Sequence, residues 1–479
     1  MSTRASGAAP IDGRRARLAA TVERPLRTGA WGFRGRLLVS GLAAVVAWGV
    51  FAWIWQLKHG LAVTGLNNHV TWGFYLTNFV FFIGISHAGT LVSAILRLSH
   101  AEWRRPITRL AEMITVVALI VGASMVVADM GRPDRLQNVI LHAHLRSPIL
   151  WDVLSISTYL AGSFLYLYLP LVPDLALLRD AHLGGRIRSK VYTLLSLRWN
   201  GGTEQRRLIG RAIGIMAVVI VPVAVSVHTV VSWIFGMTLR SGWNSTIFGP
   251  YFVVGAIFSG IAGIIVVMAI FRRVYHLEEF ITEKHFRNLG TLLLVLGVLY
   301  FYFTLSEYAT VGFKMQVGDA SLLSALLVGR FALLFWTFAI FGLILPIVLL
   351  AVPRTRTPRW IITAAVLVNI GMWLKRFVII IPSMSLPLMP YEWGSYRPTW
   401  VEWSITAAAF AAFALVFAIF ARIFPLISVW EVEEGWEVEA PRRATVPAAV
   451  RTPAPVPTPA PVPTPTRVPV PVSIAGGSS

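Results

Sequence analysis

Proton-exchanging side chains gather between residues 127 and 155, inside an otherwise very apolar chain. The stretch reads VADMGRPDRLQNVILHAHLRSPILWDVLS and contains Asp129 and Asp152, with His142 and His144 between them. Carboxylates and imidazoles accept and release protons at positions that a reaction needs. An acid in an apolar helix is costly unless it has a partner or a function. Asp129 could also simply mark a membrane boundary, and the two histidines could be ordinary loop residues.

Local helix signals place the two acids. A Gly-x-Pro sequence at 131–133 ends the helix that carries Asp129, and Ser-Pro at 147–148 caps and starts the next helix. Asp152 then lies little more than one turn inside that next helix. Because consecutive helices are usually neighbours, we expect both carboxylates at a similar depth, near one interface.

Five more polar residues fall inside apolar segments. His87 lies mid-segment in GISHAGT, His228 lies in SVHTVVSW, Glu307 lies near a segment end, and Arg376 follows Lys375 in WLKRFVII. Ionisable residues inside a membrane usually line a functional cavity. The two histidines could instead be hydrogen-bonded core residues, or could ligate a haem axially. One of the two cations is expected to pair with an acid.

The composition is that of an all-α, polytopic membrane protein. Hydrophobic residues make up 56% of the chain and charged residues 13%, with a mean hydropathy of +0.68. About ten segments are near the roughly 20 residues that a membrane-spanning helix needs. They lie at 38–58, 72–97, 107–129, 150–172, 209–235, 250–271, 288–310, 326–350, 360–381 and 401–424.

The distribution of charge predicts the orientation. A net charge of +20 could indicate nucleic-acid binding, but most of the 42 Lys and Arg residues fall in the tails and the even-numbered connections. That bias follows the positive-inside rule and predicts that both termini are cytoplasmic. The membrane is expected to be a bacterial inner membrane. The loop between Asp129 and Asp152 then lies outside. The Arg-rich first 37 residues lack an apolar stretch, so we expect no cleaved signal peptide.

The chain has no cysteine. Disulfides, thiolate zinc sites and cysteine-ligated iron–sulfur clusters are therefore excluded within it. Any iron–sulfur centre that works with this chain belongs to a partner.

An internal repeat predicts two bundles. A shift of 176 residues aligns 73–100 with 249–276, with seven identities in 28 positions. The shift spans four helices, so the repeat is parallel rather than inverted. We therefore expect two four-helix bundles and two peripheral helices. The predicted regions are 1–37 (Arg-rich cytoplasmic tail), 38–58 (peripheral helix), 59–236 (first bundle), 237–382 (second bundle), 383–424 (loop and peripheral helix) and 425–479 (acidic, then Pro-rich cytoplasmic tail).

An acid pair, a buried arginine and no redox centre suit quinol oxidation. Quinol hydroxyls are weak acids, so bases must take up their protons as electrons leave to a nearby acceptor. A proton-coupled membrane transporter without redox chemistry would use similar acids and is the main alternative.

Six motifs carry a family resemblance over residues 60–382. They are WGFYLTNFVFFIGISHAGTLVSAILRL, GRP, RSPILWDVLSISTYL, SVHTVVSW, PYFVVGAIFSG and WLKRFVII. In this order they resemble the NrfD/PsrC-like integral membrane subunits, most of all ActC-type subunits of alternative complex III, with the ActF paralogues next.

The resemblance implies oxidation of menaquinol or ubiquinol near the periplasmic face, and proton translocation. It implies three kinds of partner: an iron–sulfur, molybdopterin-like subunit (ActB-like), a second NrfD-like membrane subunit (ActF-like) and multihaem cytochrome c subunits (ActA- and ActE-like). Neither haem nor an iron–sulfur cluster is expected in this chain itself.

The resemblance also assigns roles to residues. The family acid of SPxxWD falls on Asp152. A second pocket residue, commonly His in HMGRP, falls on Asp129, which departs from the family pattern; a carboxylate titrates lower than imidazole unless it is desolvated. The expected set is Asp152 and Asp129 as proton acceptors; Arg376, His142, His144 and Trp151 as quinol-binding residues; and His87, His228 and Glu307 as proton-transfer residues.

Overall fold

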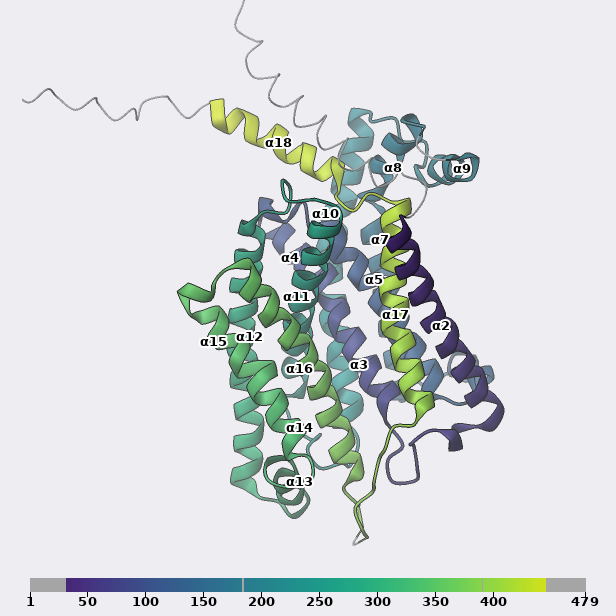
Figure 1. Cartoon of the computed structure of the whole chain (residues 1–479), viewed down its shortest axis with the longest axis vertical. Helices are drawn as coiled ribbons and strands as arrows, with labels where there is room; N and C mark the ends of the chain where they lie inside the picture. Colours follow the sequence, from purple (N-terminus) through teal and green to yellow (C-terminus); the bar gives the residue numbers. More distant parts are fainter. Residues whose placement is uncertain (1–31, 183–184, 390, 445–479) are drawn as a thin grey trace, which may run out of the picture. The chain divides into compact units, whose positions relative to one another are not determined.

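A computed structural model describes residues 32–182, 185–389 and 391–444. Within these ranges the chain is helical and contains no strand (Figure 1). The described residues up to Trp436 form one compact unit. Most of the predicted N-terminal tail and the Pro-rich part of the C-terminal tail lie outside the described residues.

Ten helices in the described part of the chain are long and apolar enough to cross a membrane, as the sequence predicts. They are α2 (Phe33–His59), α3 to α4 (Phe74–Leu98), α5 (Thr108–Asp129), α7 (Pro148–Tyr168), α10 (Thr203–Gly236), α11 (Phe248–Val274), α12 (Glu283–Lys314), α14 to α15 (Ala332–Ala351), α16 (Pro358–Ser385) and α17 (Trp400–Ile423). Between and after them lie the shorter helices α6 (Asn138–Leu141), α8 (Leu171–Asp180), α9 (Arg186–Leu195), α13 (Val317–Leu327) and α18 (Val429–Ala444). The first span begins at Phe33 instead of 38, and its first turn includes the exposed Arg34 and Arg36.

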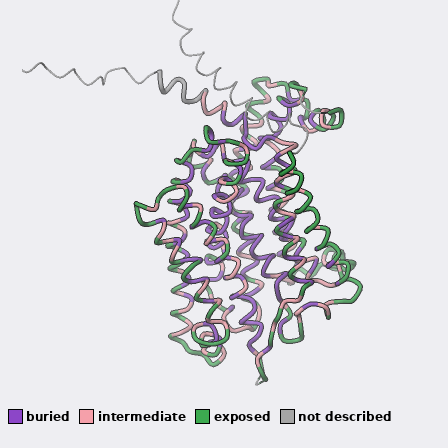
Figure 2. Tube along the Cα trace, viewed as in Figure 1, coloured by how far each residue is buried: buried purple, intermediate pink, exposed green. Residues whose placement is uncertain are grey.

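The spans pack as two groups with a peripheral pair. α5 packs on α3 and α7, and α10 packs on α7, while α12 and α16 pack on α11 and α15 packs on α12 and α16. α11 also packs on α3 and joins the two groups. α2 and α17 pack on each other, and α2 is exposed along most of its length (Figure 2). An exposed apolar surface on a span is the surface that lipid covers.

The two aligned segments end in the same way. His100 and His276, 176 residues apart, both have left-handed backbone, with φ of 53° and 54°. One residue later, the amide N–H of Ala101 donates to the carbonyl of Leu96 at 2.9 Å, and Leu277 donates to Arg272 at 3.0 Å. These paired bonds close both helix ends with one geometry, as expected for a parallel repeat.

A π-helical segment interrupts the span that carries His87. This segment, η2, covers Ala88–Val92 between α3 (Phe74–His87) and α4 (Ser93–Leu98). Its Thr90 N–H donates to the Thr115 hydroxyl at 2.8 Å. A side chain at Gly89 would collide with the Ala111 carbonyl, so this close approach requires glycine. π-helical turns occur frequently at functional sites.

The acidic segment after the last span is docked rather than free. Asp174 in α8 accepts hydrogen bonds from the N–H groups of Val429 and Trp430 at 3.2 and 3.0 Å, and thereby caps α18. Asp174 also pairs with Arg109 at 2.7 Å, and both side chains are 1% exposed. The predicted acidic tail is therefore part of the fold as far as Trp436.

A second acid in α18 is held by two arginines. The Glu431 carboxylate is 1% exposed and bridges Arg97 at 2.8 Å and Arg104 at 3.3 Å. These arginines flank the connection between the second and third spans. The C-terminal segment thus closes the predicted cytoplasmic end of the first bundle.

Candidate functional site

Asp129 and Asp152 occupy the positions that the helix signals predict. Asp129 is the last residue of α5, and Asp152 is the fifth residue of α7, which packs against α5. In each carboxylate the Oδ1 atom is buried and has no hydrogen-bond partner among the described residues. A buried polar atom without a partner costs free energy. Such atoms therefore indicate a place where a ligand, water or proton binds.

A hydrogen-bond chain supports the end of α5. Gln56 of α2 donates to the carbonyl of Ala128 at 2.7 Å and accepts from the Tyr75 hydroxyl at 2.6 Å. Gln56 is 1% exposed and Tyr75 is fully buried. Because this chain is completely enclosed, it fixes the backbone immediately before Asp129. The peripheral helix α2 thus helps to position the acid.

Glu402 places a further charge near Asp129, close enough for electrostatic interaction. It is buried at the start of α17 and accepts hydrogen bonds from the N–H groups of Gly65 at 2.7 Å and Thr399 at 3.0 Å. The Tyr396 hydroxyl donates to its other oxygen. Burial, followed by the charge of Glu402, raises the pKa of Tyr396, so this hydroxyl keeps its proton. Both carboxylate oxygens of Glu402 therefore accept hydrogen bonds from donors within the chain.

The residues expected to bind quinol are less buried than these carboxylate atoms. His142 and His144 are exposed in the connection between α6 and α7. Trp151 is half-buried, and its indole N–H donates to the carbonyl of Leu145 at 2.6 Å. In this arrangement the two histidines face solvent, and Trp151 ties the loop to the start of α7.

The structure brings His87 and His228 together in the middle of the first bundle. Both are fully buried, and His87 Nε2 lies 3.0 Å from His228 Nδ1. The Nδ1 atom of His87 lies 2.9 Å from the Ile83 carbonyl, and its Nε2 atom also contacts the Ala224 carbonyl. Carbonyl acceptors at both ring nitrogens can accommodate a proton on either one. This arrangement suits a group that takes up and passes on protons.

The histidine pair does not fit an axial haem site. Two imidazoles on one metal need about 4 Å between their ligand nitrogens, twice a metal–nitrogen bond of about 2 Å. The 3.0 Å spacing and the 3.9 Å between ring centroids leave no room for a macrocycle. Within the described residues, no cluster of three or more His, Asp or Glu side chains could hold a metal ion.

Arg376 is buried within the packed spans rather than near the exposed loop. It is 1% exposed in α16, with its guanidinium carbon 5.2 Å from the Phe252 ring centroid. Its Nη2 atom is buried without a hydrogen-bond partner in the described structure. Arg376 also interacts electrostatically with His228. The guanidinium therefore adds a buried positive charge whose field reaches His228.

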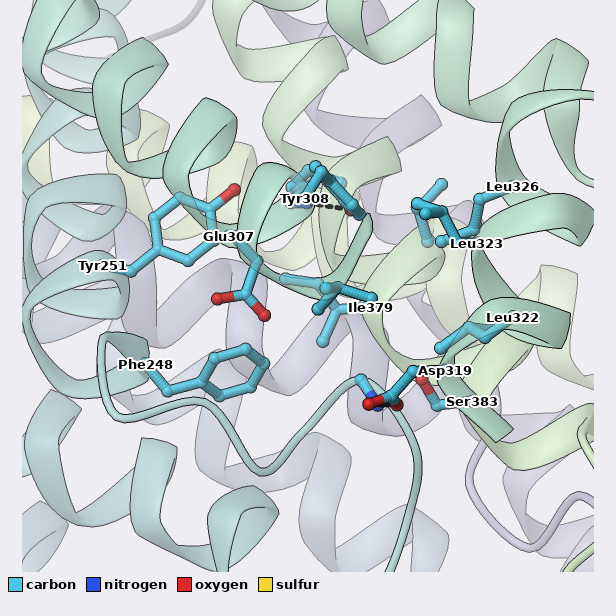
Figure 3. A pocket seen from close by; sticks show the side chains of 14 residues that line it. Phe248, Tyr251, Glu307, Tyr308, Asp319, Leu322, Leu323, Leu326, Ile379 and Ser383 are labelled. Carbon is cyan, nitrogen blue, oxygen red and sulfur yellow. Dashed lines mark hydrogen bonds between the residues drawn. The ribbon is translucent and has the colours of Figure 1, made fainter. Parts of the chain in front are cut away.

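Lys375, on the other hand, belongs to a pocket in the second bundle. Its ammonium group donates to the Tyr308 hydroxyl at 2.7 Å and lies 5.1 Å from the Phe338 ring centroid. Figure 3 shows Glu307 in the same pocket, between Tyr251 and Phe248, with Asp319 beside Ser383. The Glu307 Oε2 atom is buried without a partner in the part of the chain described. Lys375 and Glu307 interact electrostatically.

The size of this pocket decides what it can hold. Its cavity volume is about 40 Å³. One water needs roughly 10 to 15 Å³ on this measure, so the cavity accommodates about three waters. A quinone ring does not fit. The pocket around Glu307 is therefore suited to water and protons.

A family profile covers most of the chain, including all the spans of the two bundles. The profile of the family described as "Polysulphide reductase, NrfD" matches residues 62–387. The chain belongs to the NrfD family. This match confirms the family predicted from the motifs, and the chain is a membrane subunit of a redox complex.

Three relatives of this NrfD protein have informative names. It is 29% identical to a putative membrane subunit of a dimethyl sulfoxide reductase of Halobacterium salinarum, over 85% of this chain and 94% of the relative. It is 25% identical to an "Hdr-like menaquinol oxidoreductase integral membrane subunit" of Archaeoglobus fulgidus, over 74% and 84%. A shorter match, 32% identical over 19% and 22%, is to a "Menaquinone reductase, integral membrane subunit" of Nitratidesulfovibrio vulgaris.

Sequence reasoning missed a polar stripe in this NrfD protein. Tyr159, Ser163 and Tyr166 are buried and follow Asp152 in α7 at spacings of seven, eleven and fourteen residues. These spacings put all four on one helix face. The Tyr159 hydroxyl donates to the carbonyl of Ser86, directly before His87. Helical periodicity from Asp152 could have found the stripe.

Proposed function

We propose that this chain is the quinol-oxidising membrane subunit of an alternative complex III of the ActC type. The carrying observation is the pair of carboxylates, Asp129 and Asp152, each with a buried, unpartnered Oδ1 near the end of its span. Two relatives whose names include menaquinol or menaquinone support a quinone substrate. The substrate is menaquinol or ubiquinol, bound near the predicted periplasmic face.

The chemistry requires two bases and an electron acceptor. Each quinol hydroxyl gives up its proton to a carboxylate, Asp152 or Asp129, and the two electrons leave for an iron–sulfur partner. Proton removal accompanies electron loss because the hydroxyls are weak acids. With no cysteine in the sequence, a cysteine-ligated iron–sulfur acceptor must be supplied by the partner. We propose the ActB-like protein as that partner, alongside ActF-like and multihaem cytochrome c subunits.

We also propose that protons are translocated through the buried polar groups below this site. His87 and His228 contact each other in the first bundle, and the stripe of Asp152 and Tyr159 passes beside them. In the second bundle, Glu307 lines a cavity large enough for water only. The two histidines lie within hydrogen-bond distance of each other and can therefore exchange a proton.

Quinone content separates this proposal from a proton-coupled transporter. We expect organic extraction and mass spectrometry of the purified protein to recover quinone, and iron–sulfur and cytochrome subunits to co-purify. A purified complex with neither quinone nor redox subunits would favour the transporter.

Replacing His87 with Phe should separate proton transfer from quinol binding. Phenylalanine keeps a ring in the same space but cannot exchange a proton, so we expect proton-coupled activity to fall about 100-fold with unchanged quinone content. The variant His59→Phe, at the exposed end of α2, is the control. The isolated chain should show no Soret absorbance. A Soret band lost in His87→Phe would establish a haem and contradict the proton-transfer role.

Single-cysteine labelling tests the predicted orientation. Gln137 and Asn138 are exposed in the loop between α5 and α7, and the chain is cysteine-free. We expect an impermeant maleimide to label Gln137→Cys and Asn138→Cys in intact spheroplasts, more strongly after the partner is stripped. Labelling only from the cytoplasmic side would contradict the predicted topology. Equal labelling with and without the partner would contradict the proposal that the partner docks on this loop.

A further inference from the structure

The helix α9 carries an apolar stripe that the rest of the chain leaves uncovered. Ile187, Val191 and Leu194 follow one another at spacings of four and three residues and therefore share one helix face. Their side chains are 80%, 36% and 75% exposed. α9 has only ten residues and is not a membrane span. Three exposed aliphatic side chains on one short helix need a cover outside this chain.

Hydrogen bonds hold α9 at the level where two spans end. The Tyr192 hydroxyl donates to the carbonyl of Ile423, the last residue of α17, at 2.8 Å. The Tyr168 hydroxyl donates to the carbonyl of Leu195 at 2.7 Å, and Tyr168 is the last residue of α7. Figure 1 shows α9 at the same end of the molecule as α8. Because α7 and α17 cross the membrane, their last residues mark its boundary.

Basic residues surround the stripe. Arg186, Arg188 and Lys190 lie in α9, and Arg198 follows it; α9 itself contains no acid. Among the described residues, none of these four cations takes part in a salt bridge. Arg186, Lys190 and Arg198 are also exposed. Their charges are therefore available to an anionic surface.

We propose that α9 is an in-plane amphipathic helix that binds the anionic phospholipids of the adjoining leaflet. An apolar stripe flanked by Lys and Arg is the pattern of helices that lie in the headgroup region. Ile187 and Leu194 enter the boundary of the acyl chains, and the basic side chains bind lipid phosphates. A lipid surface fits better than a protein partner because the anchoring bonds already place α9 at the membrane boundary. The proposal does not depend on the quinol chemistry.

The depth of α9 can be measured with single cysteines in the full-length chain. Leu194→Cys reports the stripe, and the neighbouring exposed Thr193→Cys reports another face of the same helix. Each is labelled with an environment-sensitive fluorophore and placed in nanodiscs whose lipids have brominated acyl chains. We expect the label at 194 to be quenched several-fold more than the label at 193. Equal quenching of the two labels would overturn the proposal. So would a label at 194 that the acyl chains do not quench and that only bound partner subunits shield from water.

Charge variants test the lipid class. The variant carrying Arg186→Gln, Lys190→Gln and Arg198→Gln should lose its preference for phosphatidylglycerol over phosphatidylcholine, measured with spin-labelled lipids. Each charge removed near an anionic surface weakens binding about five-fold. The control, Arg354→Gln with Arg359→Gln, removes two exposed charges from the connection before α16 and from the first turn of α16. An equal loss of preference in this control, or no loss in the α9 variant, would contradict a site at α9.

Discussion

Replacing Asp152 with Asn is expected to lower quinol turnover about 100-fold or more, the usual scale for loss of a general base. Asparagine keeps the shape of the side chain but cannot accept the quinol proton. Asp152 is 9% exposed, and its Oδ1 atom has no partner in the described structure. Because no described group is bonded to that oxygen, we expect the complex to assemble normally. Turnover is measured with a soluble quinol analogue in the assembled complex.

A matched variant in the same loop controls for surface effects. Asp134 is 59% exposed and pairs with Arg132 at 2.9 Å. Asp134→Asn should therefore leave turnover unchanged. Near-normal turnover in a correctly assembled Asp152→Asn complex would remove Asp152 from the mechanism. A large loss for Asp129→Asn alone would assign the primary base to Asp129, the position at which this chain departs from the family pattern.

Breaking the buried pair of Arg109 and Asp174 is expected to have the largest effect on stability. Both side chains are 1% exposed and 2.7 Å apart. Removal of one partner from a buried ion pair leaves an uncompensated charge and costs about 3–5 kcal/mol. We therefore expect Arg109→Met and Asp174→Asn each to lower the free energy of unfolding by this amount. Unfolding is followed in detergent by the loss of helical circular dichroism.

The double variant distinguishes a specific pair from two independent contributions. Burial raises the pKa of Asp174, although Arg109 and the N–H groups of Trp430 and Val429 oppose it. Because the pKa of Asp174 is raised in the folded state, its protonated form stabilises the fold. This contribution is complete below pH 3.8, the ordinary pKa, and is lost as the pH rises through the folded-state pKa. The ionised pair is therefore costly to bury. The double variant should lose less than the sum of the singles, by about 0.5–3 kcal/mol.

An exposed neighbouring pair serves as the control for this cycle. Arg179 and Asp180 are 2.8 Å apart, but the Asp180 side chain is 66% exposed. Exposed pairs contribute little to stability, so Asp180→Asn should unfold like the parent. Strict additivity of Arg109→Met and Asp174→Asn would show that the two residues act separately. In that case Asp174 would act mainly as the cap of α18.

The sequence determined where the spans lie and where the two acids sit along them. Apolar segments near 20 residues predict spans because the bilayer sets their length. Gly131 and Pro133 end one helix, and the Ser-Pro at 147–148 starts another, because caps and prolines act on their immediate neighbours. Asp129 and Asp152 consequently occur in the last turn of α5 and the second turn of α7, as predicted.

Tertiary structure alone decided which polar groups meet. His87 and His228 are 141 residues apart and lie in contact, whereas the adjacent Lys375 and Arg376 face different surroundings. In spans that are apolar on nearly every face, periodicity does not reveal how each helix is rotated. Packing fixes that rotation, and packing also created the π-helical segment at Gly89 and docked Glu431 onto its arginines. These contacts depend on surfaces far apart in the chain, which no local pattern encodes.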